Sequence, residues 1–408
     1  MHSLIIFFPS DPFGERVGGI NSYIKSLIQH TPNDFVIEWI GITSDVQSRP
    51  PLQSQPLEID GRAFIFTPVL HENDQNIRRV IPLSLRYGLA IAKLKRQWDN
   101  HLLFFHRIEP VIFFKKKAGI KIVLVHNDIK EQIYAARSEV IWSKIPRLYR
   151  IFEDYVIPQF TRVYSVSEHT VDYYQQRYPM DAKKYAFLPT WVDPTIFGPR
   201  TTDRHHYRSA IYTQFQAQMT QHMLVATEPW FLFVGRLQPQ KDPFLLISSF
   251  EAYYLKHKKG YLFLIGDGNL KNELQQNIAE KHLMDRVLLL GSQNRATLKQ
   301  FYHASDTLML TSCFEGMPIS VLESLASGLP VLTPRVGEVA RVVKNGLSGE
   351  IIENRCADEI VIGMEKLIDN HSVYTQAHCV DAIQPYTPEQ VATPLFDNFR
   401  NLLDEHNQ

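Results

Sequence analysis

Short runs of apolar residues recur along the chain and alternate with longer segments in which apolar residues have helical spacing. This alternation is typical of βα units, in which buried parallel strands are covered by helices. The first half has runs at 4–8, 36–42, 64–67, 102–105, 122–125 and 163–166, and the second at 230–234, 261–265, 287–290, 307–311, 331–333 and 349–352. The pattern predicts an α/β protein with two doubly wound parallel sheets.

The runs divide the chain into two candidate domains. Residues 1–195 form the first, residues 230–388 form the second, and the strandless stretch 196–229 is interpreted as a linker or insertion. Residues 389–408 predict a terminal helix that completes the first domain, with apolar positions at Val391, Leu395, Phe399 and Leu402. Because doubly wound sheets bind ligands beyond the carboxyl ends of their strands, we expect a ligand between the two domains.

Composition is that of an ordinary soluble globular chain. Of 408 residues, 43 are basic and 43 acidic, and 44% are hydrophobic. The cysteines, Cys313, Cys356 and Cys379, are odd in number and widely spaced, so they favour neither a disulfide framework nor a zinc site and fit a reducing cytosol. The first apolar run is short and ends at Pro9, as expected for a buried strand, and no run is long enough to span a bilayer.

Two carboxylates flank a predicted helix start in the second domain. Glu315 precedes it, Pro318 suits its first position, Glu323 lies in its second turn, and Gly328 with Pro330 ends it. The segment Gly316, Met317, Pro318, Ile319 and Ser320 is a candidate phosphate-binding segment. Its backbone N–H groups could bind a phosphate, except at Pro318, which has no N–H. The acids on either side would accept hydrogen bonds from the hydroxyls of a sugar and of a ribose. A sugar, a diphosphate and a ribose together make up a nucleotide sugar. Alternatively, Glu315 only complements the helix dipole and Glu323 faces solvent.

Two cations follow the first strand of the same domain. Arg236 can donate two hydrogen bonds to phosphate oxygens, and Lys241 offers a compact charge for a departing phosphate. Asp242 is a suitable N-cap and Pro243 a suitable first residue for the next helix. The alternative is a solvated loop. The neighbouring acids favour the phosphate site.

A glycine-rich turn follows the next strand. Gly266 and Gly268 resemble the first half of a dinucleotide fingerprint, but Lys271 replaces the third glycine and no acid ends the following strand. NAD is therefore disfavoured, and we expect a turn past a nucleotide.

The first domain has candidate residues at three strand ends. Gly18 and Gly19 precede a helix expected to open at about Asn21, where the backbone can approach a phosphate closely. His106, followed by Arg107, and His126 each end a strand, where a histidine can donate to a sugar hydroxyl. Either histidine could instead be a satisfied structural residue.

Together these motifs resemble the retaining glycosyltransferases of family 4, which have the GT-B fold of two Rossmann-like domains facing a cleft. The resemblance covers nearly the whole chain. It is strongest in the second half, at Gly235-Arg236, Lys241-Asp242-Pro243, Gly266-Asp267-Gly268, the Glu315/Glu323 pair and Gly328-Leu329-Pro330.

The resemblance implies roles for these positions. Arg236 and Lys241 would bind the diphosphate of a UDP- or GDP-sugar, Glu315 the hydroxyls of the transferred sugar, and Glu323 the ribose. The base would contact mainly the backbone, around Ser292 to Arg295 and at the Gly266–Gly268 turn. In the first domain, Gly18 and Gly19 would close on the phosphates, His126 would stand beside the donor sugar, and His106 and Arg107 would lie on the acceptor side. The reaction implied is transfer with retention to a carbohydrate or lipid-linked saccharide, as in bacterial surface polysaccharide or lipopolysaccharide assembly. No Asp-x-Asp occurs, so we expect no metal and no other cofactor.

A basic region extends from Arg78 to Arg150, with 16 basic and 5 acidic residues interleaved with aromatics. In a neutral protein this suggests an anionic partner, and we favour peripheral contact with the inner face of a membrane from a cytoplasmic location. The alternative is a solvated face. No recognisable nucleic-acid module accompanies the charge.

Two other functions fit the same scaffold. A glycosyl phosphorylase or sugar-nucleotide hydrolase would release sugar without a carbohydrate acceptor. A non-enzymatic sugar- or lipid-binding protein would not need to keep all four of Arg236, Lys241, Glu315 and Glu323.

Overall fold

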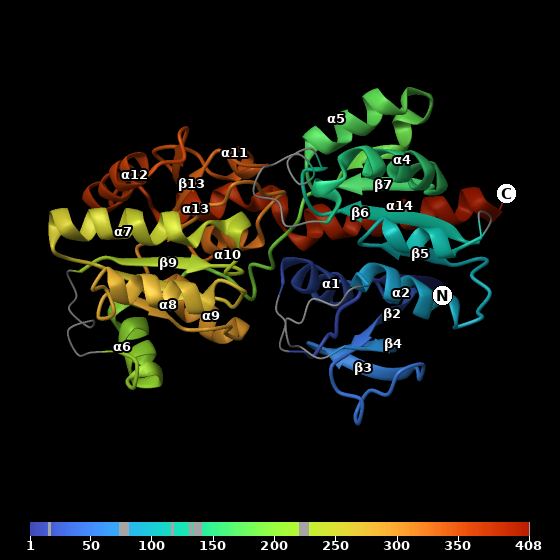
Figure 1. The fold of residues 1–408 in the computed structure, drawn as a ribbon, viewed down its shortest axis with the longest axis horizontal. Helices are drawn as coiled ribbons and strands as arrows, with labels where there is room; N and C mark the ends of the chain where they lie inside the picture. Colours follow the sequence, from blue (N-terminus) through green and yellow to red (C-terminus); the bar gives the residue numbers. More distant parts are fainter. Residues whose placement is uncertain are drawn as a thin grey trace. The chain divides into compact units, whose positions relative to one another are not determined.

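The computed structural model describes residues 1–14, 18–72, 81–115, 118–129, 133, 141–219 and 228–407. The chain folds into two compact units (Figure 1). The first contains the described residues up to Thr190 together with those from Pro388 onward, and the second contains Trp191–Thr387. Each unit is an α/β layer structure with its own apolar core.

The first unit is built on an eight-stranded sheet in the order β3-β4-β2-β1-β5-β6-β7-β8. Neighbours pair in parallel except β3 with β4, which are antiparallel. The strands are β1 (His2–Phe7), β2 (Phe35–Thr43), β3 (Gln55–Ile59), β4 (Arg62–His71), β5 (Leu102–Phe105), β6 (Ile120–Val125), β7 (Arg162–Ser165) and β8 (Tyr185–Phe187). Connections leave β1 toward opposite edges through β2 and β5, so a switch point lies between β1 and β5.

Helices and 3-10 turns connect these strands. They are α1 (Gly19–Gln29), α2 (Leu83–Ala92), η1 (Glu109–Phe113), η2 (Ile141–Lys144), α4 (Pro146–Val156), η3 (Ile157–Gln159), α5 (Glu168–Arg177) and η4 (Pro179–Lys184). The last helix, α14 (Pro388–Asn407), returns to this unit, as the apolar spacing predicted. Phe396 contacts Phe35 with ring centroids 5.1 Å apart, and Phe399 meets Phe104 edge-on at 5.5 Å.

The second unit has a six-stranded, wholly parallel sheet in the order β11-β10-β9-β12-β13-β14. This is the order of a dinucleotide-type doubly wound sheet, with its switch point between β9 and β12. The strands are β9 (Trp230–Val234), β10 (Tyr261–Ile265), β11 (Val287–Leu289), β12 (Thr307–Met309), β13 (Val331–Pro334) and β14 (Gly349–Ile352). The predicted α/β class with two doubly wound parallel sheets is therefore confirmed.

Helices cover both faces of this sheet, and α7 and α9 lie on opposite sides of β9 (Figure 1). They are α6 (Arg204–Phe215), η6 (Pro239–Lys241), α7 (Pro243–His257), α8 (Lys271–Glu280), α9 (Arg295–Ala304), α10 (Ile319–Ala326), α11 (Val339–Val342), α12 (Ala357–Asp369), α13 (Gln376–Ala382) and η7 (Gln384–Tyr386). Phe231 of β9 packs on Tyr253 of α7, whereas Phe263 of β10 packs on Phe301 of α9.

The stretch interpreted as a linker packs on the second unit where the structure describes it. Helix α6 places the buried Arg208 guanidinium 2.8 Å from Asp306 and over the ring of Trp230, and Phe215 contacts Phe301. The Asp306 carboxylate also accepts a hydrogen bond from the Trp230 amide at 2.7 Å. The two compact units divide after Thr190.

Among the described residues, no helix combines the length and apolar character that crossing a bilayer requires.

Candidate functional site

The loops that follow β9 and β12 meet at the switch point of the second unit. The Cys313 amide donates to the Gln240 carbonyl at 2.8 Å, and the Gln240 side chain donates back to the Phe314 carbonyl at 3.0 Å. The Thr311 hydroxyl lies 2.9 Å from the carbonyls of both Lys241 and Asp242. These bonds follow from neighbouring parallel strands, whose carboxyl ends bring the two loops together.

An ion pair between Lys241 and Glu315 lies where the loops meet. The Lys241 ammonium donates to the Glu315 carboxylate, and Glu315 is only 5% exposed. Sequence patterns predicted both residues for the site but not that they pair with each other. The pair matters electrostatically, because a buried carboxylate without it would repel a phosphate; with it, the local charge is balanced.

Asp242, the residue after Lys241, is held by contacts on two sides. It is the N-cap of α7, as predicted, with a left-handed backbone (φ 46°) and a side chain that accepts from the Leu245 amide at 3.4 Å. Arg355, on the segment after β14, donates to the other carboxylate oxygen of Asp242 at 2.5 Å and to the Thr311 carbonyl at 3.2 Å. Arg355 was missed by sequence reasoning, because nothing near it in the chain marks it as a partner of the β9 loop.

Helix α10 begins beside Glu315. Pro318 is its N-cap, with extended backbone, and Ile319 is its first residue, so the prediction that Pro318 occupies the first helical position is wrong by one residue. The first amides of a helix have no carbonyl one turn earlier to bond, and those of Ile319 and Ser320 are at this position. The Glu338 amide donates to the Gly316 carbonyl at 2.9 Å, and Gly328 (φ +74°) follows the end of the helix.

Glu323, in the second turn of α10, faces α9. Its carboxylate accepts a hydrogen bond from the Tyr302 hydroxyl at 2.8 Å, and the charge of Arg295 at the start of α9 acts on it. Burial raises the pKa of Glu323 to about 7, opposed by the Tyr302 hydrogen bond and by Arg295. Thus Glu323 does not simply face solvent, and Tyr302 is a partner that the sequence did not reveal.

The glycines after β10 hold two loops together. Gly266 (φ +142°) lies so close to the β9 loop that a Cβ there would be 1.9 Å from the Gly235 carbonyl oxygen, and one at Gly268 would be 2.3 Å from that of Leu237. The Leu237 amide donates to the Asp267 carbonyl at 3.0 Å. The predicted tight turn is therefore present. Glycine is required in it because the β9 loop lies so close. Arg236, between Gly235 and Leu237 in that loop, is exposed. Ser292, after β11, is also exposed.

In the first unit, His106 and His126 share a hydrogen bond. The two ring nitrogens are 2.7 Å apart and the rings stack with centroids 5.0 Å apart. Burial lowers the pKa of His126 to about 3 and holds the pKa of His106 well below its usual range, so both rings are neutral near pH 7. Tyr23 of α1 meets both rings edge-on and was not predicted from the sequence.

The other positions predicted in this unit are Gly18 and Gly19 at the start of α1, and Arg107, which follows His106. Helix α1 starts at Gly19, two residues earlier than expected, with Gly18 as an N-cap in extended conformation. A Cβ at Gly18 would meet nothing within 4 Å. Arg107 forms a two-pronged ion pair with Glu109, with nitrogen–oxygen distances of 2.7 and 3.2 Å.

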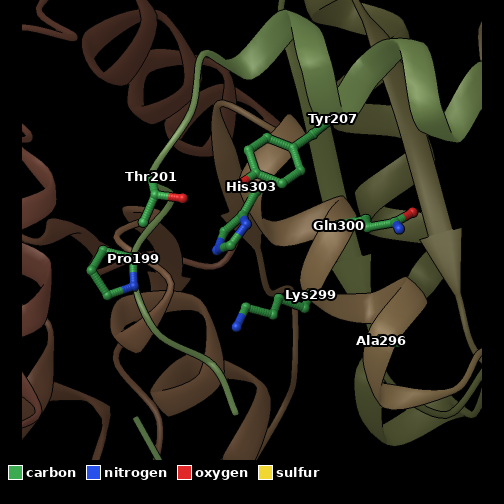
Figure 2. A pocket seen from close by; sticks show the side chains of 7 residues that line it. All are labelled: Pro199, Thr201, Tyr207, Ala296, Lys299, Gln300 and His303. Carbon is green, nitrogen blue, oxygen red and sulfur yellow. The ribbon is translucent and has the colours of Figure 1, made fainter. Parts of the chain in front are cut away.

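A separate pocket of about 310 Å³ lies against α6 and α9 of the second unit (Figure 2). It is lined by Pro199, Thr201, Tyr207, Ala296, Lys299, Gln300 and His303. The buried His303 ring is held to the Gly198 carbonyl at 2.8 Å and meets the Tyr207 ring edge-on. None of the residues predicted for the nucleotide-sugar site lines this pocket.

No cluster of three or more His, Cys, Asp or Glu side chains suited to a metal ion occurs in the part of the chain that the structure describes.

Two units with these strand orders define a protein of the GT-B class, and comparison with known proteins agrees. The family model described as glycosyl transferases group 1 matches residues 214–382, and that described as glycosyltransferase family 4 matches residues 17–196. The chain belongs to the group 1 glycosyltransferases and is a glycosyltransferase.

Relatives and a solved structure agree with that assignment. The chain is 26% identical over 319 residues to the UDP-Gal:alpha-D-GlcNAc-diphosphoundecaprenol alpha-1,3-galactosyltransferase of Escherichia coli, covering 76% of this chain and 75% of the relative. It is 20% identical over 321 residues to the lipopolysaccharide 1,2-N-acetylglucosaminetransferase of Salmonella typhimurium, covering 73% and 80%. The sucrose-phosphate synthase of Thermosynechococcus elongatus has the same fold, with a TM-score of 0.78 at 16% identity over 99% of this chain and 100% of that one.

Proposed function

We propose that this glycosyltransferase moves a sugar from a UDP-sugar to a saccharide or lipid-linked saccharide acceptor, with retention of configuration and without a metal ion. The observation that carries the proposal is the Lys241–Glu315 pair at the switch point of the second sheet, beside the start of α10. A doubly wound sheet binds its ligand at this point. UDP is preferred to GDP because the Escherichia coli relative is named for UDP-galactose.

The donor would exchange the internal pair for contacts of its own. Lys241 and Arg236 would bind the diphosphate together with the first amides of α10, while Glu315 accepts hydrogen bonds from the hydroxyls of the sugar. Glu323 would accept from the ribose, and the base would contact the backbone around Ser292 and Arg295 and at the Gly266 turn. The balanced charge of the Lys241–Glu315 pair supports this, since one ligand that carries both phosphate and hydroxyls satisfies both partners.

For the first unit, we propose that the amides at Gly18 and Gly19 bind phosphate oxygens. His126 would hydrogen-bond a sugar hydroxyl as a neutral ring, which its low pKa supports. His106 would set the orientation of His126 through their hydrogen bond, and Arg107, already paired with Glu109, would lie on the acceptor side.

In the reaction, the bond between the anomeric carbon and the phosphate oxygen breaks while the acceptor hydroxyl oxygen bonds to the same carbon. The departing diphosphate takes the proton of that hydroxyl. Lys241, Arg236 and the α10 amides would stabilise the negative charge that develops on the leaving group, a role that is electrostatic and costs no reorganisation when the groups are already in place. The acceptor would belong to bacterial surface polysaccharide or lipopolysaccharide assembly, which is supported by one relative named for a diphosphoundecaprenol-linked sugar and another named for lipopolysaccharide. We propose a cytoplasmic location for the reaction.

Calorimetry with UDP and GDP, followed by a nucleotide-release assay over a panel of sugar donors, tests the proposal. We expect micromolar UDP binding, weaker GDP binding, and release of UDP that requires a saccharide acceptor and persists with EDTA present. Release without any acceptor would indicate a hydrolase instead. Loss of release with EDTA that manganese restores would contradict metal independence.

A further inference from the structure

Helix α4 exposes an apolar stripe along its outer side. Leu148, Ile151 and Tyr155 are spaced three and four residues apart and are 53%, 67% and 60% exposed, and Ile145, just before the helix, is 41% exposed. The opposite side of α4 is buried through Tyr149, Glu153 and Val156. Single exposed apolar residues are common, but a continuous stripe at helical spacing on a helix already anchored by its other side indicates a contact surface.

Neighbouring elements carry more exposed apolar side chains. The η1 turn packs on α2 and also contacts α4. Its Phe113 ring lies so close to Gly88 of α2 that a Cβ there would be 2.1 Å from the ring. Ile112 on η1 is 39% exposed, and Leu85 and Leu89, one turn apart on α2, are 43% and 49% exposed. Exposed apolar side chains therefore occur on three adjoining elements.

The charged residues around this stripe are mainly cationic. Exposed cations lie on or next to the three elements, at Lys93, Lys95, Lys115, Lys144, Arg147 and Arg150. The carboxylates of α4 and η1 are engaged within the protein: Arg177 binds Asp154, Tyr173 and Tyr174 donate to Glu153, and Arg107 binds Glu109. An approaching surface therefore meets apolar side chains and cations, while the acids of α4 and η1 are already neutralised or hydrogen-bonded.

We propose that the outer side of α4, extended by η1 and α2, binds the surface of an anionic lipid bilayer. Apolar side chains flanked by lysine and arginine on a helix that lies in the interface plane are the features that bind such a surface, with the apolar groups entering the acyl boundary and the cations near the phosphates. Tyr155 suits the same position because its ring is apolar and its hydroxyl polar. The inference deepens the proposed function, on which it rests for a lipid-linked acceptor, and it reduces the basic region of the sequence to a defined set of residues.

Sedimentation of the full chain with vesicles tests this proposal. We expect the protein to pellet with vesicles of phosphatidylglycerol and phosphatidylcholine, to bind at least tenfold less to phosphatidylcholine alone, and to be released by high salt. Leu148→Glu combined with Ile151→Glu should reduce binding at least tenfold, and Arg147→Glu with Arg150→Glu should do the same. Ile362→Glu is the matched control, since Ile362 is 61% exposed on α12 of the second unit and should not change binding.

The outcomes separate this proposal from the donor site. UDP affinity measured in solution should be the same in all these variants, because none of the changed residues belongs to the second unit except the control. Unchanged vesicle binding in the α4 variants, or equal binding to neutral vesicles, would overturn the proposal even if UDP binds. A protein that ignores vesicles but changes from dimer to monomer when Leu148 and Ile151 become glutamate would show that a second copy of the chain covers this side instead.

Discussion

At the scale of residues, three carboxylates at or near the candidate site of the second unit already have side-chain partners in the ligand-free structure. Lys241 neutralises Glu315, Tyr302 donates to Glu323, and Arg355 binds Asp242. A ligand that contacts these carboxylates must therefore replace or extend an existing hydrogen bond or ion pair. The existing partners avoid the large free-energy cost of burying an unpaired charge, as at the carboxylate of Glu315.

Changing either partner of the Lys241–Glu315 pair should separate binding from turnover. Lys241→Ala should weaken UDP binding and reduce transfer by about 100- to 1000-fold, since the cation that would stabilise the leaving phosphate is lost. Glu315→Gln should keep UDP binding but reduce transfer to a similar extent, because the sugar loses its acceptor group while the phosphate contacts remain. Calorimetry and steady-state kinetics measure the two effects. Lys344→Ala, an exposed cation on another loop, is the control, and unchanged turnover in both site variants would refute the assignment.

Glu323 should give donor binding a pH dependence with its midpoint near pH 7. The ionised carboxylate is the better acceptor for ribose hydroxyls, so affinity for a UDP-sugar, whose diphosphate does not titrate here, should rise between pH 6 and 8. In the wild-type protein the Tyr302 hydrogen bond lowers the pKa of Glu323. Because Tyr302→Phe removes this hydrogen bond, the midpoint should move to higher pH. Glu323→Gln should flatten the profile, as measured by calorimetry across the range.

The same raised pKa affects stability of the ligand-free protein. The folded chain holds a proton on Glu323 that the unfolded chain releases more readily, so this contribution is present below the unfolded pKa and is lost as pH rises through 7. A Glu323→Gln variant that kept the wild-type pH dependence of both stability and binding would contradict this account.

At the scale of elements, the sequence predicted most of what positions the site. Each predicted apolar run is a strand, since strands buried on both faces are continuously apolar. Strand β3 was missed because it is an edge strand with Pro56 and alternating exposure, and β8 because it is the short strand at the other edge, where only Tyr185 is fully buried. The sequence also shows which charged residues follow the strands, because they come directly after the apolar runs. Their pairing was not, because partners such as Tyr302 and Glu323 meet only when α9 and α10 pack in the folded unit.

Two glycines should respond differently to alanine because their surroundings differ. Gly266→Ala forces a Cβ against the Gly235 carbonyl at a φ that side chains rarely adopt, and should destabilise the second unit by about 1–3 kcal/mol. Gly18→Ala has open space and extended backbone, so stability should not change, but transfer should fall if the α1 amides approach a phosphate. Thermal unfolding and a transfer assay measure both. An equal loss of stability at the two positions would contradict the structure.

At the scale of the molecule, the chain completes its first unit with its last helix. Aromatic rings of α14 pack against Phe35 of β2 and Phe104 of β5. Arg400 also binds both carboxylate oxygens of Asp34, at 2.8 and 2.9 Å. The apolar spacing predicted this helix. Helix α6 joins the second unit through the buried Arg208, and a sequence pattern does not show which unit a helix between two sheets will cover.

The shared core of α14 and the first sheet gives a prediction about independent units. Phe399→Ala should lower the stability of the first unit by about 3–5 kcal/mol, because it removes a fully buried ring that packs on Phe104. UDP binding, assigned to the second unit, should persist under conditions where the fold is retained. Asn401→Ala, exposed on the same helix, is the control. Denaturant unfolding with calorimetry measures both, and a Phe399→Ala protein as stable as the Asn401→Ala protein would contradict the packing described.

The return of α14 also sets an order of events during synthesis. The ribosome must make everything between Thr190 and Pro388, about 200 residues, after the last strand of the first unit has emerged. At about 5–20 residues per second this takes roughly 10–40 s. For that interval Phe35 and Phe104 lack the partners that will cover them, while the second unit can finish folding first. The first unit can therefore be completed only after the whole of the second unit has been synthesised.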